Sequence, residues 1–179
     1  MTDSKIIKLP LNEEIISTLH AGEHILLSGI VYTARDAAHK RIVEALESNN
    51  KLPFELNNSV IYYTGPAPAR PGRPIGSAGP TTSYRMDPYT APLLKAGVRG
   101  IIGKGERGRK IALALQKYKS VYFAAVGGAG ALLSERIISC EVVAYADLGT
   151  EAVHKLEIKN FPVIVAQDIF GGNVYKNNQ

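Results

Sequence analysis

The chain has 179 residues, 45% of them hydrophobic and 21% charged, which is a usual composition for one compact globular domain. It contains no apolar run of about 18 residues, so we expect no membrane-spanning helix. The formal net charge is +5. Basic and acidic residues nevertheless alternate along most of the chain, and aromatic residues are not interleaved with the basic ones, which argues against a nucleic-acid-binding surface.

Hydrophobic periodicity predicts that strands and helices alternate along the chain. The expected strands lie at 5–9, 23–31, 60–63, 98–102, 121–126, 142–146 and 163–166. The expected helices lie at 12–19, 33–46, 87–96 and 106–118, with a short helix after residue 130. Residues 173–179 are predicted to form a tail. We therefore expect one α/β domain over residues 1–179, with a mixed sheet flanked by helices.

Capping signals mark three helix starts. Asn12 is expected to cap the first helix, and Thr33, with Asp36 three residues later, to cap the second. Asp87 is expected to cap the third, because Pro88 would then occupy its first turn. This arrangement would place Arg35 in the first turn of a helix directly after a strand, with its guanidinium directed toward the end of the sheet.

The cysteine content restricts metal binding and location. Cys140 is the only cysteine, so an intramolecular disulfide is impossible and a reducing cytoplasm is the expected location. The first five residues also lack the basic start and apolar stretch of a signal peptide. One thiol cannot hold an iron–sulfur cluster, and the four histidines have no zinc-like spacing. We expect that this chain binds no metal and that His39 lies at a surface or an interface.

The glycine-rich segments do not match nucleotide-binding motifs. Residues 127–130 (Gly-Gly-Ala-Gly) lack the G-x-G-x-x-G spacing, and residues 103–105 (Gly-Lys-Gly) lack the upstream glycine of a P-loop. We interpret 127–130 as a tight strand-to-helix turn whose backbone approaches a neighbour. Residues 65–82 are rich in proline and glycine and predict a long loop, either functional or disordered.

Three cations are candidates for binding an anionic substrate. Arg35 and Lys104 both follow predicted strands, and clefts in α/β sheets form at such junctions. Arg85 follows a turn that offers several hydroxyls and backbone N–H groups. Arginine binds a carboxylate with two parallel hydrogen bonds, and lysine adds a compact charge. Together the three would suit a substrate with two carboxylates.

Three motifs resemble one enzyme family. They are Thr-Ala-Arg-Asp-Ala-Ala-His at 33–39, Gly-Pro-Thr-Thr-Ser-Tyr-Arg-Met-Asp at 79–87 and Gly-Lys-Gly at 103–105. With them the chain resembles, over nearly its whole length, the β subunit of class I (iron–sulfur) fumarate hydratases and L(+)-tartrate dehydratases. The run at 79–87 is the most specific, because neither packing nor turn chemistry requires it as a whole.

The resemblance implies a swivelling β/β/α domain that docks on a separate α subunit. It also implies that the α subunit holds a [4Fe–4S] cluster through three cysteines and that this chain binds none. The expected protein is a cytoplasmic hydro-lyase of the citric acid cycle that acts on a small dicarboxylate. It is expected to be a hetero-oligomer. The β chain alone should be inactive.

The resemblance also assigns roles to residues. Arg35, Arg85 and Lys104 match the carboxylate-binding cations of the family. Thr81 matches the hydroxyl that moves the proton at the substrate carbon, and Thr82 shapes the same turn and belongs to the substrate-binding set. A threonine hydroxyl is a weak base unless a neighbour takes its proton. No such neighbour is evident in this sequence, so the α subunit is the expected source.

Alternatives remain open at this stage. Fumarate is favoured because central metabolism makes its hydration the commoner task. L(+)-tartrate and methyl-substituted fumarate stay open, because one methyl or hydroxyl group changes the binding free energy in a pocket by only ~1–3 kcal/mol. A different class of function is a stand-alone anion- or nucleic-acid-binding module. Its cations would be Arg70, Arg73, Lys104, Arg107, Arg109 and Lys110. That function leaves the run at 79–87 unexplained.

Overall fold

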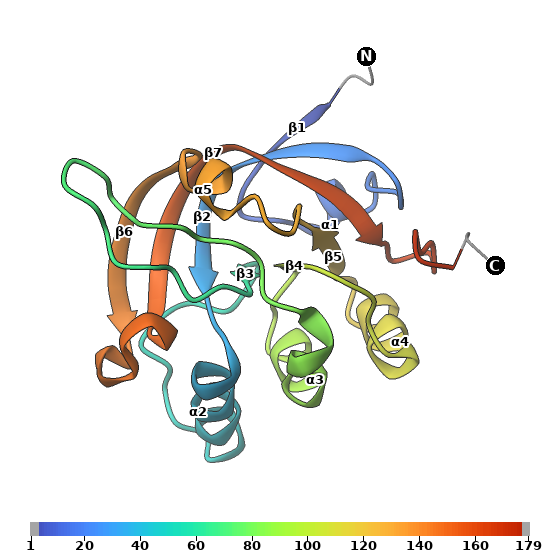
Figure 1. The fold of residues 1–179 in the computed structure, drawn as a ribbon. Helices are drawn as coiled ribbons and strands as arrows, with labels where there is room; N and C mark the ends of the chain where they lie inside the picture. Colours follow the sequence, from blue (N-terminus) through green and yellow to red (C-terminus); the bar gives the residue numbers. More distant parts are fainter. Residues whose placement is uncertain (1–3, 177–179) are drawn as a thin grey trace.

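The computed structural model describes residues 4–176. Within this range seven strands form one sheet (Figure 1). The strands are β1 (Lys5–Lys8), β2 (His24–Thr33), β3 (Val60–Tyr62), β4 (Gly100–Gly103), β5 (Val121–Ala124), β6 (Ile137–Ala144) and β7 (Val153–Gln167). The helices are α1 (Glu13–Ile16), α2 (Asp36–Glu47), α3 (Asp87–Lys95), α4 (Arg109–Lys117) and α5 (Gly130–Ser134), with 3-10 helices η1 (Ser83–Met86) and η2 (Ala146–Glu151).

The sheet is mixed and closes on itself. Strands β1 to β5 pair in parallel in chain order, and β7 runs antiparallel to β2, β5 and β6. Because β7 pairs with β5 and also with β2, the strands β2, β3, β4, β5 and β7 form a ring. The α/β class and the mixed sheet flanked by helices are confirmed.

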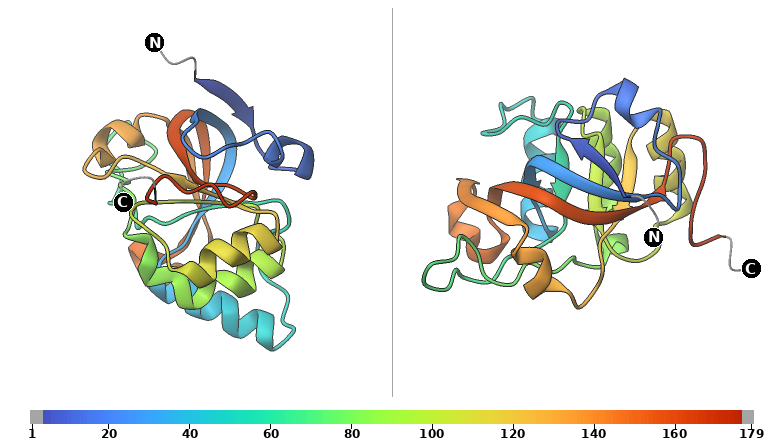
Figure 2. Two further views of the ribbon diagram at one scale, coloured as in Figure 1. Left: turned by 90° about the vertical axis from the view of Figure 1, so that its right-hand side faces the viewer. Right: turned by 90° about the horizontal axis from the view of Figure 1, so that it is seen from above.

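Two hydrophobic cores cover the two faces of this sheet. Successive side chains of a strand point to opposite faces, so Val60 and Tyr62 of β3 join one core while Ile61 and Tyr63 join the other. The first core gathers residues from all seven described strands. The second lies between the sheet and α2, α3 and α4, which Figure 2 shows side by side along one face of the sheet.

The prediction for the last two strands was wrong in extent. β7 covers 15 residues, whereas only 163–166 were predicted, and β6 begins at Ile137 rather than at 142. Lys155, Glu157 and Lys159 interrupt the apolar sequence, but they alternate with buried residues such as Leu156 and Ile158. This part of the strand is therefore half-buried, and these three charged residues face outward.

Two of the three predicted caps were also wrong in detail, since Thr33 does not cap α2 and Met86, not Asp87, is the N-cap of α3. The Asn12 side chain accepts a hydrogen bond from Ile15 N at 2.8 Å, which confirms that cap, although α1 ends at Ile16. Thr33 ends β2 instead, and its hydroxyl accepts from His154 N at 3.0 Å, which joins β2 to β7. Arg35 occupies the N-cap position of α2 and so precedes its first turn.

The C-terminal segment is packed as far as the structure describes it. Val174 N donates to Ala166 O at 3.0 Å, and Asn173 is buried. The prediction of a tail is therefore wrong for residues 173–176, and residues 177–179 lie outside the described range. Among the described residues, no helix has the length and apolar character needed to cross a membrane.

Candidate active site

The residues proposed from sequence follow neighbouring parallel strands. Strands β2, β3, β4 and β5 are adjacent and parallel, so their carboxyl ends lie along one edge. Arg35 follows β2, Lys104 follows β4, and Gly127 follows β5. Thr81 returns to the end of β3, where its N–H donates to Tyr63 O at 2.6 Å. The fold therefore brings the predicted segments to the same edge of the sheet.

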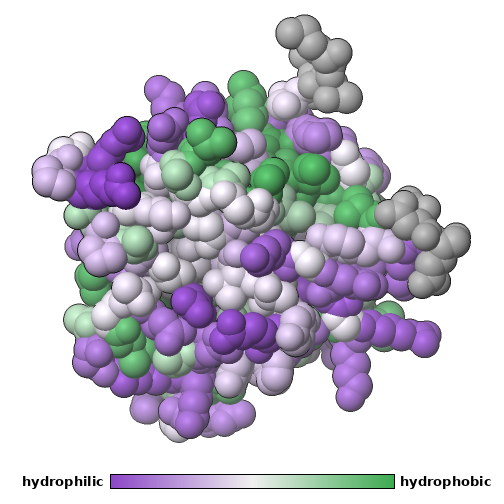
Figure 3. All heavy atoms as spheres, viewed as in Figure 1, coloured by the Kyte–Doolittle hydropathy of each residue, from purple (hydrophilic) through white to green (hydrophobic). Residues whose placement is uncertain are grey.

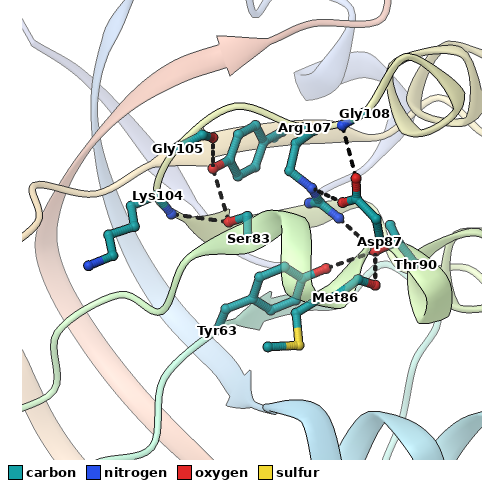
Figure 4. A network of polar contacts seen from close by, with 10 residues as sticks. Tyr63, Ser83, Met86, Asp87, Thr90, Lys104, Gly105, Arg107 and Gly108 are labelled. Atoms are coloured by element: carbon teal, nitrogen blue, oxygen red, sulfur yellow. Dashed lines mark hydrogen bonds and ion pairs between the residues drawn. The ribbon is translucent and has the colours of Figure 1, made fainter.

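Backbone contacts tie the threonine turn to Lys104. Thr82 forms a parallel bridge with Lys104. Ser83 N donates to Lys104 O at 2.9 Å, and Lys104 N donates to Ser83 Oγ at 3.1 Å. The Lys104 side chain is left free of this network, and Figure 4 shows its amino group pointing away from it. Lys104 can therefore offer its charge beside the hydroxyls of the turn.

Arg85 reaches the start of α2 and lies close to Arg35. Arg85 Nη2 lies 3.0 Å from Asp36 Oδ2, and Asp36 directly follows Arg35. Arg35 Nε lies 3.7 Å from Glu151 Oε1, and the Arg35 side chain is 28% exposed against 46% for Arg85. Both side chains are partly exposed to solvent, so each guanidinium can bind an anion without first leaving a packed hydrophobic core.

Close backbone approaches explain three of the glycines at this edge. A Cβ on Gly65 would lie 2.9 Å from Arg35 Cδ, and one on Gly130 would lie 2.8 Å from Gly79 N. Gly127 lies alongside Lys104, whose Cδ would be 3.4 Å from an added Cβ. The expected close approach of the turn at 127–130 to a neighbour is confirmed, and the neighbour is the Gly79 turn.

Thr81 has no activating partner in the part of the chain that the structure describes. Within residues 4–176 its backbone N–H is bonded, but its hydroxyl has no hydrogen-bond partner. Thr82 likewise contributes through its backbone. The geometry is compatible with a hydroxyl that faces a bound molecule, and a base for it would come from outside this chain.

A buried polar network beneath the site was not found from the sequence (Figure 4). Arg107 Nε lies 2.6 Å from Asp87 Oδ1, and Arg107 Nη2 donates to Thr90 Oγ1 at 2.7 Å. The Arg107 side chain is 0% exposed. The alternative that counted Arg107 among surface cations is therefore wrong for this residue. Asp87 is the first residue of α3, and its carboxylate binds Arg107 and Gly108 N instead of capping α3.

His39 is another residue whose prediction was wrong. Its side chain is fully buried, against the rings of Tyr63 and Tyr89. Nδ1 lies 2.8 Å from Arg35 O, and since a carbonyl can only accept, Nδ1 carries the proton. Burial lowers the pKa of His39 to about 4, against the hydrogen bond to Arg35 O, which favours the charged form. The ring is therefore neutral near pH 7 and supports the backbone of Arg35.

The low pKa of His39 predicts a pH-dependent stability. The unfolded chain takes up this proton near pH 6.5 and the folded chain only near 4, so folding is favoured fully above about pH 6.5 and loses up to ~3 kcal/mol as pH falls toward 4. His39→Asn keeps a donor for Arg35 O but cannot titrate. Urea unfolding at both ends of this range should show a smaller pH effect in His39→Asn than in the wild type.

The exposed His24 provides the control for this measurement. His24→Asn makes the same substitution at an exposed position, and we expect its pH dependence of unfolding to match that of the wild type. An equal pH dependence in His39→Asn and the wild type would contradict the assignment of this proton to His39.

The hollows of the surface do not coincide with these residues. A groove of about 600 Å³ lies among α2, α3 and Tyr118, away from the four proposed residues. A smaller groove of about 260 Å³ is lined by Arg70, Arg73 and α5. Figure 3 shows that the centre of the face seen in Figure 1 is covered mostly by residues of intermediate hydropathy. The proposed residues therefore form an open edge rather than an enclosed pocket.

The described residues do not fit an iron–sulfur cluster. No group of three histidine, cysteine, aspartate or glutamate side chains within residues 4–176 is arranged to hold a metal. The one cysteine, Cys140, is half-buried in β6, and burial raises the pKa of its thiol. A cluster that needs several thiolates would have to be held by residues other than these.

Comparison with known proteins gives matches along the chain. Residues 2–178 match the family described as Fumarase C-terminus. The chain is 40% identical over 172 residues to a protein of Methanocaldococcus jannaschii provisionally named L(+)-tartrate dehydratase subunit beta. This match covers 93% of this chain and 88% of that protein.

Two further relatives are longer proteins. The chain is 34% identical over 182 residues to the anaerobic class I fumarate hydratase of Escherichia coli, and 37% identical over 152 residues to the mitochondrial fumarate hydratase 1 of Leishmania major. These matches cover 97% and 84% of this chain, but only 33% and 28% of the two hydratases. The chain thus spans about a third of the length of these relatives.

Proposed function

The chain belongs to the fumarase C-terminus family, and from that membership we propose that it is the β subunit of a hydro-lyase that interconverts fumarate and L-malate. Residues 1–179 would act as one domain. The enzyme class is supported by the names of the relatives, which are fumarate hydratases and a tartrate dehydratase subunit. The choice of fumarate and the role of each residue are our proposal.

The observation that supports this function best is the convergence of three cations with one free hydroxyl. Arg35 is the N-cap of α2, Arg85 lies in η1 and Lys104 follows β4, and the Thr81 turn lies between the ends of β3 and β4. A substrate with a carboxylate at each end needs two cationic contacts and one group near the carbon between them. The edge of the sheet at the carboxyl ends of β2 to β5 offers this combination.

The proposed chemistry is the reversible addition of water across a carbon–carbon double bond. In the dehydration of malate, the C–H bond next to one carboxylate and the C–O bond of the hydroxyl break, and the double bond forms. Thr81 would move the proton at this carbon. Arg35, Arg85 and Lys104 would hold the carboxylates and stabilise the negative charge that develops when the proton leaves.

The proposed partner is a cluster-bearing α subunit. This chain lacks the thiols for a [4Fe–4S] cluster, so the partner would hold the cluster that binds the leaving hydroxyl. Tyr84 and Val126 support a docking face at this edge, because both are 63% exposed and lie next to Arg85 and Gly127. The complex would be a hetero-oligomer whose site is completed only on assembly.

L(+)-tartrate is the second candidate substrate. It is supported by the relative from Methanocaldococcus jannaschii, which matches over 88% of its length and carries that name provisionally. Tartrate dehydration uses the same proton transfer and the same two carboxylates, with one more hydroxyl. Methyl-substituted fumarate is a third candidate of the same class. The exposed cations Arg70, Arg73, Arg109 and Lys110 leave a separate anion-binding role as a candidate of another class.

The first experiment is hydration of fumarate under anaerobic conditions, followed by the loss of fumarate absorbance. The chain would be assayed alone and after assembly with its α subunit. Activity in the mixture only is the expected result. An intact complex with its cluster that hydrates no fumarate would shift the substrate to tartrate or methyl-fumarate, and steep salt dependence of binding to any DNA duplex would favour the other class.

Lys104 is predicted to act mainly in substrate binding. In the assembled complex, Lys104→Ala should raise KM at least as strongly as it lowers kcat, by about 10–100-fold, because a hydrogen bond to a charged group contributes ~1.5–3 kcal/mol. Steady-state kinetics with fumarate measure both constants. Lys110→Ala on the exposed face of α4 is the matched control and should change neither. An unchanged KM for Lys104→Ala would count against this role.

A further inference from the structure

We propose that Arg107 and Asp87 form a positioning pair that sets the spacing between the two loops of the site. One loop is η1 with Arg85, and the other is the turn from Lys104 to Arg109, between β4 and α4. Neither Arg107 nor Asp87 belongs to the set of residues that would touch substrate. This inference rests on the proposed function, since it concerns the same site.

The first support is the pattern of bonds between the two loops. The Asp87 carboxylate directly follows η1 and accepts from Arg107 Nε at 2.6 Å and from Gly108 N at 2.9 Å. Both donors belong to the turn that carries Lys104. One carboxylate therefore joins the segment that bears Arg85 to the segment that bears Lys104, at two points.

The second support is the burial of the Arg107 guanidinium. Its side chain is 0% exposed, with Nη2 bonded to Thr90 Oγ1 at 2.7 Å. The guanidinium carbon lies 5.4 Å from the centre of the Tyr63 ring and 5.3 Å from that of Tyr122. A cation held on so many sides cannot reach a substrate, so its effect on the reaction must pass through the groups that it fixes.

The third support is that the same network reaches the threonine turn. Tyr63 contacts Arg107 through its ring, and its carbonyl oxygen accepts from Thr81 N at 2.6 Å. The Tyr122 hydroxyl lies 3.0 Å from Ser83 Oγ, which accepts from Lys104 N. Figure 4 shows Tyr63, Ser83 and Lys104 with Arg107 in one group of polar contacts.

Breaking the pair should disturb residues that it does not touch. In Asp87→Asn the side chain keeps its shape but loses its charge, so the two loops should separate more often. Amide hydrogen exchange should then accelerate at Ser83 and Lys104, whose N–H groups bond across the loops but not to Asp87. In the assembled complex, kcat/KM should fall by about 10²-fold, the usual cost of a displacement of ~1 Å.

A core variant separates positioning from general loss of stability. Leu115 is buried in α4 and packs in the second core, away from the pair. Leu115→Ala should destabilise the fold as much or more, yet leave kcat/KM within about threefold and exchange at Ser83 and Lys104 unchanged at temperatures where the protein is folded. Equal effects of Leu115→Ala and Asp87→Asn on both readouts would overturn the proposal.

A second variant covers the case in which Asp87→Asn does not fold. Thr90→Val keeps the side-chain shape and removes the acceptor of Arg107 Nη2, together with the bonds of this hydroxyl to Met86 O and Tyr63 OH. It leaves the Arg107–Asp87 bond in place and should shift both readouts in the same direction by a smaller amount. Unchanged exchange in Thr90→Val would then overturn the proposal. If the wild-type complex hydrated no dicarboxylate, the proposed function would fail, while the exchange measurement would still decide whether the pair sets the loop spacing.

Discussion

Replacing Arg85 with alanine is expected to abolish hydration of fumarate by the assembled complex without unfolding this chain. Arg85 is the cation of the run at 79–87, and nearly half of its side chain is exposed at the edge of the sheet. A charged donor that acts on developing negative charge contributes about 10²–10³-fold to kcat, and the loss of ground-state binding adds to this. Turnover should therefore fall below detection in a routine assay.

The same substitution should have little effect on stability. The Arg85–Asp36 pair is solvent-exposed, with 46% and 35% of the two side chains accessible. Exposed pairs contribute ~0–1 kcal/mol, so the free energy of unfolding in urea should change by less than about 1 kcal/mol. Arg41→Ala is the matched control, because Arg41 pairs with Asp147 at 2.6 Å and is 38% exposed. It should lose a similar ion pair but keep full activity.

Near-normal hydration by a complex containing Arg85→Ala would remove Arg85 from the site. It would also weaken the assignment of Arg35, because Arg85 pairs with Asp36, the residue that directly follows Arg35. A loss of activity in Arg41→Ala of similar size would instead show that any broken surface ion pair impairs assembly.

The site could be located from the sequence because its residues are close to ends of strands. Arg35 and Lys104 follow strands with clear apolar patterns, and parallel neighbouring strands end at one edge, so their proximity follows from the order of elements. Thr81 and Arg85 were different. They lie after a long loop whose path depends on contacts such as that between Tyr62 OH and Ala78 O at 2.5 Å. The hydroxyl-rich turn made Arg85 a candidate, and only the resemblance pointed to Thr81.

The parts that the sequence did not predict depend on contacts between distant residues. His39 and Arg107 are polar, and polar residues are usually exposed unless they find partners. The Asp87 carboxylate lies 20 residues from Arg107 in the sequence. The rings that bury His39 are those of Tyr63, directly after β3, and Tyr89, in α3, although its bond to Arg35 O is local. A local pattern contains no signal for such pairs. The 15 residues of β7 were missed for a related reason, since only the closed ring decides which face of that strand is buried.

Thr81 is the residue whose removal should separate proton transfer from binding. Thr81→Val preserves the shape of the turn and the backbone bond to Tyr63 O but removes the hydroxyl. If this hydroxyl moves the proton at the substrate carbon, kcat should fall by about 10²–10⁴-fold while KM changes little. Exchange of the malate C3 proton with solvent, followed by NMR, should slow to the same extent.

Thr82→Val provides the comparison that makes this test decisive. Thr82 lies in the same turn and contacts Lys104 through its backbone, so its substitution reports the cost of adding an apolar surface there. A much smaller loss of kcat is expected. Equal losses in the two variants would mean that the turn is important only for its shape, and the proton would then have to move through a group of the α subunit. A selective loss in Thr81→Val would assign to this chain one chemical step of the proposed reaction.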